Sequence, residues 1–214
     1  MSNLTTVNFY ILYIVLKIFR SKNLAYTKMS TEALVLKWGI VACGKISQDF
    51  CTALLSLKSD KQKLQACGEL DKTAAEKYEI EKFADKFQIP TYYDSYDAVF
   101  ADKEVNIVYI GSLNTSHKEL SIKALNAGKH VLCEKPMTMN SKEQEEVLAA
   151  SKSNNKFFME ALWTRHFPVI ARLKEELKNK TIGELRFFTS TFTNPINTTE
   201  RIRLKELGGG AIYE

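Results

Sequence analysis

The sequence predicts an α/β fold in which a doubly wound parallel sheet has helices on both faces. Short, almost wholly apolar runs recur along residues 34–158, and a helical pattern separates each run from the next. Alternating strands and helices favour βαβ units, and parallel strands buried on both faces are nearly continuous in apolar residues. The expected strands are Leu36–Ala42, Leu64–Cys67, Ile107–Ile110, Val131–Cys133 and Phe157–Met159. The expected helices are Ile46–Leu57, Lys72–Phe87, Ser95–Ala101, Ser116–Ala127 and Ser141–Ser153.

Two helix ends have recognisable sequence patterns. Ser141 and Gln144 have the spacing of a Ser-x-x-Gln capping box, which predicts a helix start at Ser141. Gly128 directly follows the preceding helix, where a residue in the left-handed conformation commonly ends a helix. Both patterns support the boundaries of the expected helices.

The regular alternation of strands and helices ends after Met159. A helix is expected at about Pro168–Lys178 and a strand at Leu185–Thr193. One helix and one strand cannot form an independent core. We therefore expect an N-terminal extension at 1–33, an α/β domain at 34–158 and the incomplete start of an α+β domain at 159–214.

Composition excludes several classes of partner. The apolar fraction of 45% and the charged fraction of 26% are ordinary for a globular protein. The net charge of +5 comes from scattered lysines, without the basic stripe and interleaved aromatics of a nucleic-acid binder. The four cysteines lack metal-ligand spacing, so no metal is expected. Because these cysteines lie mostly in apolar runs, we expect buried reduced thiols and a cytoplasmic location.

The first 28 residues differ in character from the rest. Val7–Leu16 is apolar or aromatic except for Asn8, but a membrane span needs about 20 apolar residues. Membrane attachment is therefore the weaker alternative to an unstructured extension, because the sequence from Met29 resembles the start of a domain.

The turn after the first expected strand has one glycine of a dinucleotide-binding pattern. Ala42, Gly44 and Ser47 occupy the three glycine positions of G-x-G-x-x-G. Such a turn brings backbone N–H groups at a helix start to a pyrophosphate, which makes Ala42, Gly44, Lys45 and Ile46 candidate cofactor contacts. An ordinary strand–helix turn explains a single glycine equally well.

Charged residues follow the second expected strand, where the adenosine ribose is normally recognised. Glu69 or Asp71 could accept hydrogen bonds from ribose hydroxyls, which favours NAD. Lys72 could pair with a 2′-phosphate, which favours NADP. Solvated loop charges are an equally good interpretation, so these residues leave the cofactor open.

The segments "GSLNTSH" and "AGKHVLCEKPMTMN" together make the pattern specific. A Rossmann-type unit whose fifth strand ends in Glu-Lys-Pro resembles the glucose–fructose oxidoreductase/inositol dehydrogenase family. "LKWGIVACGKISQDF", "FFMEALWTRHFP" and "ELGGGA" extend the resemblance from about Leu36 to Glu214. It implies an enzyme that oxidises a trans-dihydrodiol, or an aldose such as D-xylose, with NADP or alternatively NAD. It also implies a small-molecule substrate, and we expect the intact form to be a homodimer.

The resemblance assigns a role to Lys135. In the family this lysine lies beside the nicotinamide and the reacting hydroxyl, where an ammonium stabilises a developing alkoxide. Glu134 is expected to contact the cofactor ribose or to hold the lysine, and Pro136 to fix the backbone. A surface lysine at a strand end is the alternative interpretation of Lys135.

Four further residues are candidates by resemblance. Asn114 and His117 follow the fourth strand and are expected near the nicotinamide half of the cofactor. For His117, a helix start without a ligand is an equal alternative. Trp163 and Phe192 match aromatic positions that line the family's substrate pocket, although Phe192 on an apolar strand could equally pack in a core.

The pattern breaks at the end of the sequence. The family's proton-transfer tyrosine follows the glycine-rich turn in a segment of roughly D-I-G-x-Y, and Glu214 falls at the aspartate position. Tyr213 is a poor substitute, because adjacent positions point in different directions. We expect this chain to bind cofactor weakly and to turn over slowly or not at all. The alternative is a non-catalytic dinucleotide-binding fragment or sensor.

Overall fold

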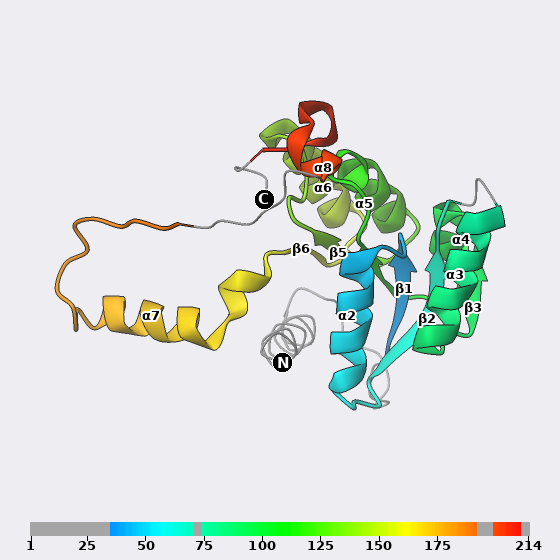
Figure 1. Ribbon diagram of the computed structural model, residues 1–214, viewed down its shortest axis with the longest axis horizontal. Coiled ribbons are helices and arrows are strands. Elements are labelled where there is room, and N and C mark those ends of the chain that lie inside the picture. Colours follow the sequence, from blue (N-terminus) through cyan, green and yellow to red (C-terminus); the bar gives the residue numbers. More distant parts are fainter. Residues whose placement is uncertain (1–34, 71–73, 192–198, 211–214) are drawn as a thin grey trace.

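A six-stranded parallel sheet organises the computed structural model, which describes residues 35–70, 74–191 and 199–210 (Figure 1). The strand order is β3-β2-β1-β4-β5-β6, and every neighbouring pair is parallel. The strands are β1 (Leu36–Val41), β2 (Gln62–Gly68), β3 (Thr91–Tyr93), β4 (Ile107–Ile110), β5 (His130–Glu134) and β6 (Phe158–Ala161). The order reverses between β1 and β4, and open α/β sheets bind ligands at such a point. The predicted fold class is confirmed.

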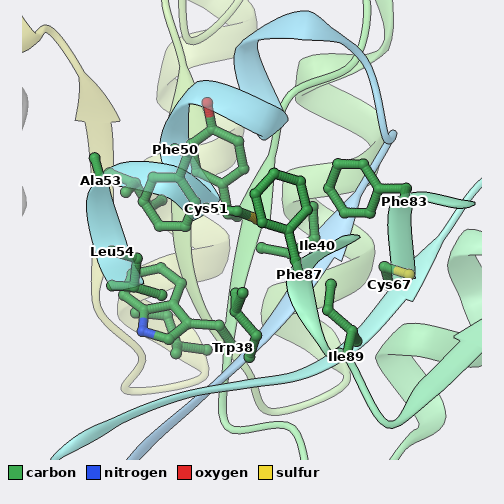
Figure 2. Packing of buried hydrophobic residues seen from close by; sticks show 14 of the residues in the cluster. Trp38, Ile40, Phe50, Cys51, Ala53, Leu54, Cys67, Phe83, Phe87 and Ile89 are labelled. Carbon is green, nitrogen blue, oxygen red and sulfur yellow. The ribbon is translucent and has the colours of Figure 1, made fainter. Parts of the chain in front are cut away.

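Helices cover both faces of the sheet. Cores on opposite faces contain residues of α2 and α3 in one case and of α4, α5 and α6 in the other. These helices are α2 (Lys45–Ser56), α3 (Ala74–Phe87), α4 (Tyr96–Ala101), α5 (His117–Asn126) and α6 (Ser141–Ser153). Figure 2 shows the core beneath α2 and α3, where the Trp38 and Phe50 rings meet edge to face with centroids 5.0 Å apart. Tyr109 stacks on the same Phe50 ring at 3.9 Å, so aromatic packing fixes α2 over β1 and β4.

The strand prediction is wrong at two places. Thr91–Tyr93 forms the short edge strand β3, which the sequence pattern missed because its side chains are polar or aromatic and partly exposed. The expected strand at 185–193 does not form over 185–191, and residues 192–193 lie outside the described segments. The side chain of Phe187 is 84% exposed there. No described strand pairs with residues 185–191, and an extended segment without a neighbour forms no hydrogen-bonded ladder.

Helix α6 begins at Ser141 and ends at Ser153, as predicted, but its capping residue differs from the prediction. Asn140, and not Ser141, is the N-cap, and its Oδ1 accepts a 3.0 Å hydrogen bond from the backbone N of Glu143. The carboxylate of Glu143 in turn accepts from Met139 N at 3.1 Å. Asn caps as well as Ser does, so the reciprocal bonding forms one residue earlier than expected. Gly128 has φ +78° and follows Ala127, the C-cap of α5, so the predicted left-handed residue at this helix end is confirmed.

The chain beyond β6 leaves the sheet and then returns to it. It forms η2 (Trp163–His166) and α7 (Pro168–Lys178), which projects away from the sheet in Figure 1 and buries none of its residues. It continues after the undescribed segment with α8 (Glu200–Arg203) and η3 (Lys205–Leu207). A Cβ on Gly208, which has φ +77°, would lie 2.9 Å from Met139 Sδ. Gly208, directly after η3, therefore packs closely on Met139, and η3 lies against the turn at Asn114–Ser116, at the carboxyl edge of the sheet.

Three further predictions concern the N-terminal extension, membrane attachment and the state of the cysteines. The expected extension at 1–33 lies outside the described residues. In the segments that the structure covers, no helix has the length and apolar character needed to cross a membrane. All four cysteines are free thiols; Cys51, Cys67 and Cys133 are buried, and burial raises the pKa of Cys51 and of Cys133.

Candidate functional site

A cleft of about 1320 Å³ lies along the carboxyl ends of the strands. It is bordered by the turns that follow β1, β2, β4 and β5, and by residues of η2 and α8. The lining includes Ala42, Gly44, Lys45, Ile46, Glu69, Tyr96, Asn114, His117, Glu134, Lys135, Trp163, Phe167, Thr199 and Arg201. Predicted cofactor and substrate residues from five separate parts of the sequence therefore share one cavity.

The turn after β1 is closed by its own residues. Ala42 has φ +67°, in the left-handed region that the first glycine of the dinucleotide pattern normally occupies. The hydroxyl of the fully buried Ser47 donates a 2.6 Å hydrogen bond to the carbonyl of Ala42. Ala42 and Ser47 thus reproduce the tight turn without two of the three glycines.

The fold does not require a glycine at position 44, so the reason for this glycine lies in the cleft. Its φ of −69° suits any residue, and a Cβ built on it would meet no atom within 4 Å. It is the N-cap of α2, and no side chain caps this helix. The first turn of α2, with Lys45 and Ile46, therefore opens into the cleft as anion sites at helix starts do. The ammonium of Lys45 pairs with Asp49 at 2.7 Å.

Glu69 holds the turn from the end of β2. Its carboxylate accepts hydrogen bonds from Cys43 N at 2.8 Å, Leu70 N at 3.0 Å and the Tyr96 hydroxyl at 2.6 Å. Burial, reinforced by this carboxylate, raises the pKa of Tyr96 and keeps its hydroxyl a donor. A carboxylate has about four acceptor positions, so Glu69 retains capacity for a ribose hydroxyl. Asp71 and Lys72 lie outside the described residues.

The Glu-Lys-Pro turn after β5 is anchored on both sides. Glu134 accepts from the Tyr109 hydroxyl at 2.8 Å and from Lys135 N at 3.2 Å, while Met137 N donates to Glu160 at 2.9 Å. Burial raises the pKa of Glu134, and the bonds from Tyr109 and Lys135 oppose that shift. The peptide bond between Lys135 and Pro136 is cis. Lys135 is thereby presented, half-buried, at the wall of the cleft.

Asn114 and His117 line the same cleft, but both also bind backbone carbonyls. The amide of Asn114 donates to Gly208 O at 3.4 Å. The ring of His117 lies with Nδ1 2.7 Å from Pro136 O and Nε2 3.1 Å from Ser112 O. Burial lowers the pKa of His117. These two residues therefore join loops as well as lining the cavity.

Aromatic side chains border the cleft on the side of η2. The Trp163 ring is 38% exposed and meets Phe167 edge to face, with centroids 5.8 Å apart. Phe192 lies outside the described residues. Phe167 was not predicted from the sequence. Nor were three residues that hold other parts of the site: Tyr96, Tyr109 and Glu160. The one available indication was the position of Glu160, directly after the last expected strand.

A family model described as "Oxidoreductase family, NAD-binding Rossmann fold" matches residues 36–162, more than half of the chain. The chain belongs to this Gfo/Idh/MocA family. The resemblance stated from the motifs is thereby confirmed, and the parallel sheet is the family's NAD-binding Rossmann domain.

Curated relatives are named trans-1,2-dihydrobenzene-1,2-diol dehydrogenase. Those of Xenopus laevis and Mus musculus are 38% and 39% identical to this chain over 181 residues, which are 85% of this chain and 53% of each relative. The chain thus spans about half the length of the curated relatives it matches.

Two solved structures show a similar fold. KijD10, a 3-ketoreductase from Actinomadura kijaniata in complex with NADP and TDP-benzene, has a TM-score of 0.75 at 26% identity. An NAD-binding protein from Listeria innocua has a TM-score of 0.66 at 31% identity. Each match covers 84% of this chain, and 53% and 51% of the respective structures.

Proposed function

We propose that the chain provides the cofactor-binding part of an NADP-dependent dehydrogenase that oxidises a trans-dihydrodiol or an aldose such as D-xylose. Membership of an oxidoreductase family and the names of the relatives support the reaction class. NADP in the KijD10 complex supports the cofactor. A homodimeric intact form, a cytoplasmic location and a domain boundary near residue 159 stay predictions.

The observation on which cofactor binding depends is the open space at Gly44. Neither backbone conformation nor packing requires a glycine there, whereas a pyrophosphate passing the start of α2 does. Backbone N–H groups of the first turn of α2 would hold the phosphates. Glu69 would receive a hydroxyl of the adenosine ribose, and Asn114 would lie toward the nicotinamide half.

Lys135 is proposed to act on the substrate. Oxidation of an alcohol removes a hydride from carbon and a proton from oxygen. Bound nicotinamide supplies the hydride acceptor. The ammonium of Lys135 would hold the reacting hydroxyl and stabilise negative charge that develops on its oxygen, while the proton passes to solvent water. The faces of Trp163 and Phe167 suit a ring-shaped substrate, with a sugar or a dihydrodiol as the candidates.

The choice between NADP and NAD depends on the end of β2. The resemblance and the NADP-bound neighbour favour NADP. The carboxylate of Glu69 favours NAD, because it would repel a 2′-phosphate close to it. Titration of the purified chain with NADPH and with NADH, followed by nicotinamide fluorescence, separates the two.

A Gly44→Asp variant tests the site itself. A like charge about 5 Å from a phosphate costs roughly 3 kcal/mol at the effective dielectric constant of a protein surface, so nucleotide affinity should fall at least about tenfold. Thr52→Asp makes the same charge change on an exposed position of α2 outside the cleft lining and should leave affinity unchanged. Equal affinities in the two variants, or a wild-type chain that binds neither nucleotide, would contradict the proposal.

Turnover distinguishes an enzyme from a binding protein. Lys135→Met should retain nucleotide binding and lose oxidation of D-xylose or of a trans-dihydrodiol. Oxidation of either substrate by the wild-type chain that is lost in Lys135→Met would rule out the alternative, a non-catalytic dinucleotide-binding protein. Nucleotide binding without oxidation agrees with that alternative and also with the slow turnover expected of this chain.

A further inference from the structure

His117 connects two loops that border the cleft. Its side chain is 1% exposed, at the first residue of α5. Nδ1 lies 2.7 Å from the carbonyl oxygen of Pro136, in the turn after β5, and Nε2 lies 3.1 Å from that of Ser112, after β4. The carbonyl of Pro136 is one residue from Lys135, so the ring is bonded to the turn that presents the lysine.

Both partners of the ring are hydrogen-bond acceptors. A neutral imidazole has one N–H group and can satisfy one of them, whereas its other nitrogen then turns a lone pair toward a carbonyl oxygen. An imidazolium has two N–H groups and satisfies both. The geometry around His117 therefore differs in energy between the two protonation states, and protonation adds a second hydrogen bond between the loops.

Neighbouring charges act on the ring in opposite directions. Glu160 of β6 favours the protonated ring, and Lys135 of the turn after β5 disfavours it. The positive end of the α5 dipole also disfavours the cation. Burial is the largest effect and lowers the pKa of His117 below 6.5. The ring is therefore neutral at pH 7, and acidification supplies the second N–H.

The turn at 135–137 also accepts support from two carboxylates, which lie on β5 and β6 and not in the loop after β4. Glu134 and Glu160, which bind Lys135 N and Met137 N, belong to β5 and β6. His117 instead bonds the turn to the loop after β4, which also contains Asn114. The distance between that loop and Lys135 is thus set through the ring.

We propose that His117 is a positioning residue for Lys135, holding the turn at 135–137 against Ser112 with one hydrogen bond when neutral and with two when protonated. The inference depends on the proposed function only in that Lys135 is taken as the group that acts on the substrate. The coupling between His117 and Lys135 exists without bound cofactor, and it can be measured that way.

The decisive measurement uses the wild-type 214-residue chain. Lysine amines are labelled by reductive methylation with ¹³C, the Lys135 resonance is assigned with Lys135→Arg, and both this resonance and the His117 ring are followed by NMR against pH. The Lys135 resonance should show an inflection below pH 6.5 that coincides with protonation of His117. A Lys135 resonance without that inflection overturns the proposal, whether or not any His117 variant folds.

Two isosteric variants test the individual bonds. The amide N of His117→Asn falls near Nδ1 and keeps a donor for Pro136 O, while that of His117→Gln falls near Nε2 and keeps a donor for Ser112 O. Both should lose the inflection. We assign the single N–H of the neutral ring to Nδ1, because its contact with Pro136 O is the shorter one. The asparagine variant should therefore keep the wild-type Lys135 shift at pH 7.5 and the glutamine variant should not; identical Lys135 shifts in the two variants overturn the proposal.

His130→Asn is the matched control. It removes a second buried histidine from the opposite end of β5, so the Lys135 inflection should persist. NADPH affinity is the second measurement. Loss of one hydrogen bond predicts a dissociation constant about threefold to tenfold higher in the glutamine variant and within about twofold of wild type in the asparagine variant. Absence of NADPH binding in all proteins would refute the proposed function, while the resonance of Lys135 still decides the role of His117.

Discussion

At the scale of single residues, the turn that begins the cleft is held in a conformation that its alanine disfavours. Ala42 has φ +67°, and left-handed backbone costs an L-residue with a Cβ roughly 1–2 kcal/mol. Ala42→Gly should therefore raise the free energy of unfolding by up to about 1 kcal/mol, since added freedom of the unfolded chain offsets part of the gain. Ala42→Val should lower it by about 1–2 kcal/mol, as measured by urea unfolding.

Lys58→Gly provides the control for this prediction. Lys58 also has a positive φ, of +46°, but it lies after α2 and outside the lining of the cleft. Lys58→Gly should also raise the free energy of unfolding, and it should leave nucleotide affinity unchanged. A loss of stability in Ala42→Gly would show that residue 42 is not strained.

His130 makes the stability of the protein depend on pH. Phe157 N donates to its Nδ1 at 3.0 Å, which requires that nitrogen to be unprotonated. Burial, helped by Lys156, lowers the pKa of His130 from 6.5 to about 4. The unfolded chain thus binds the proton more readily, and stability present above pH 6.5 is lost as the pH falls to 4. The loss attributable to His130 is at most about 3 kcal/mol.

His130→Asn isolates this contribution. The asparagine Oδ1 keeps an acceptor for Phe157 N but has no proton to gain, and all other titrating groups are shared with the wild type. Urea unfolding at intervals from pH 7 to pH 4.5 should give converging stability curves, with the variant the less steep. Parallel curves would mean that protonation of His130 does not contribute to the loss of protein stability on acidification.

At the scale of elements, two neighbouring polar residues at the start of α6 differ in their contribution to helix capping. Asn140 caps the helix by accepting from Glu143 N, whereas Ser141 is already the first residue of the helix. Asn140→Ala should therefore lower the free energy of unfolding by about 1 kcal/mol, and Ser141→Ala should change it by less than about 0.5 kcal/mol. Thermal and urea unfolding measure both. A larger loss in Ser141→Ala would restore the capping box expected from the sequence.

The strands that were predictable contain an apolar run. This holds even for the edge strand β6, most of whose residues are only partly buried. β1, β4 and the centre of β5 (Val131–Cys133) are largely apolar and buried, with helices on both faces of the sheet. β3 was not predictable, since an edge strand of three residues with an exposed Tyr92 leaves no apolar run. The segment 185–191 has strand-forming residues without a described partner, and pairing is a property of two segments that one segment's composition does not contain.

The site was predictable where a motif places a side chain. Gly44 and Lys135 followed from the turn and from the Glu-Lys-Pro motif, and both line the cleft. The bonds of His117 were not predictable, because its acceptors are backbone carbonyls of Ser112 and Pro136 that any residue would provide. Glu160 was missed for the same reason: it accepts from a backbone N–H on another strand's turn.

At the scale of the whole molecule, the strand order reverses between β1 and β4, and the turns on each side of this point are held together by different residues. The turns after β1 and β2 are tied together by Glu69, which accepts from Cys43 N. The turns after β4 and β5 are tied together by His117. An extended ligand across the cleft would therefore contact two walls, each held by its own hydrogen bonds, that meet where β1 pairs with β4. Such preorganisation reduces the ordering that binding must impose.

The exposed apolar chain beyond α7 predicts self-association of this 214-residue protein. Ile182, Phe187 and Phe188 are 66%, 84% and 70% exposed, close together in sequence and without a described pairing strand. Exposed apolar segments of extended backbone promote association. Replacing both phenylalanines with serine should lower the weight-average sedimentation coefficient at high protein concentration. It should change the free energy of unfolding by less than about 0.5 kcal/mol, since neither ring is buried.

A matched pair of substitutions tests whether position matters or only apolar content. Leu55→Ser with Leu148→Ser removes two exposed leucines from α2 and α6, which are 51% and 46% exposed and far apart in sequence. Isolated apolar side chains are ordinary on protein surfaces, so this pair should leave sedimentation unchanged. Wild-type sedimentation in the phenylalanine variant at every concentration, or an equal decrease in both variants, would rule out the segment around Phe187 and Phe188 as the site of association.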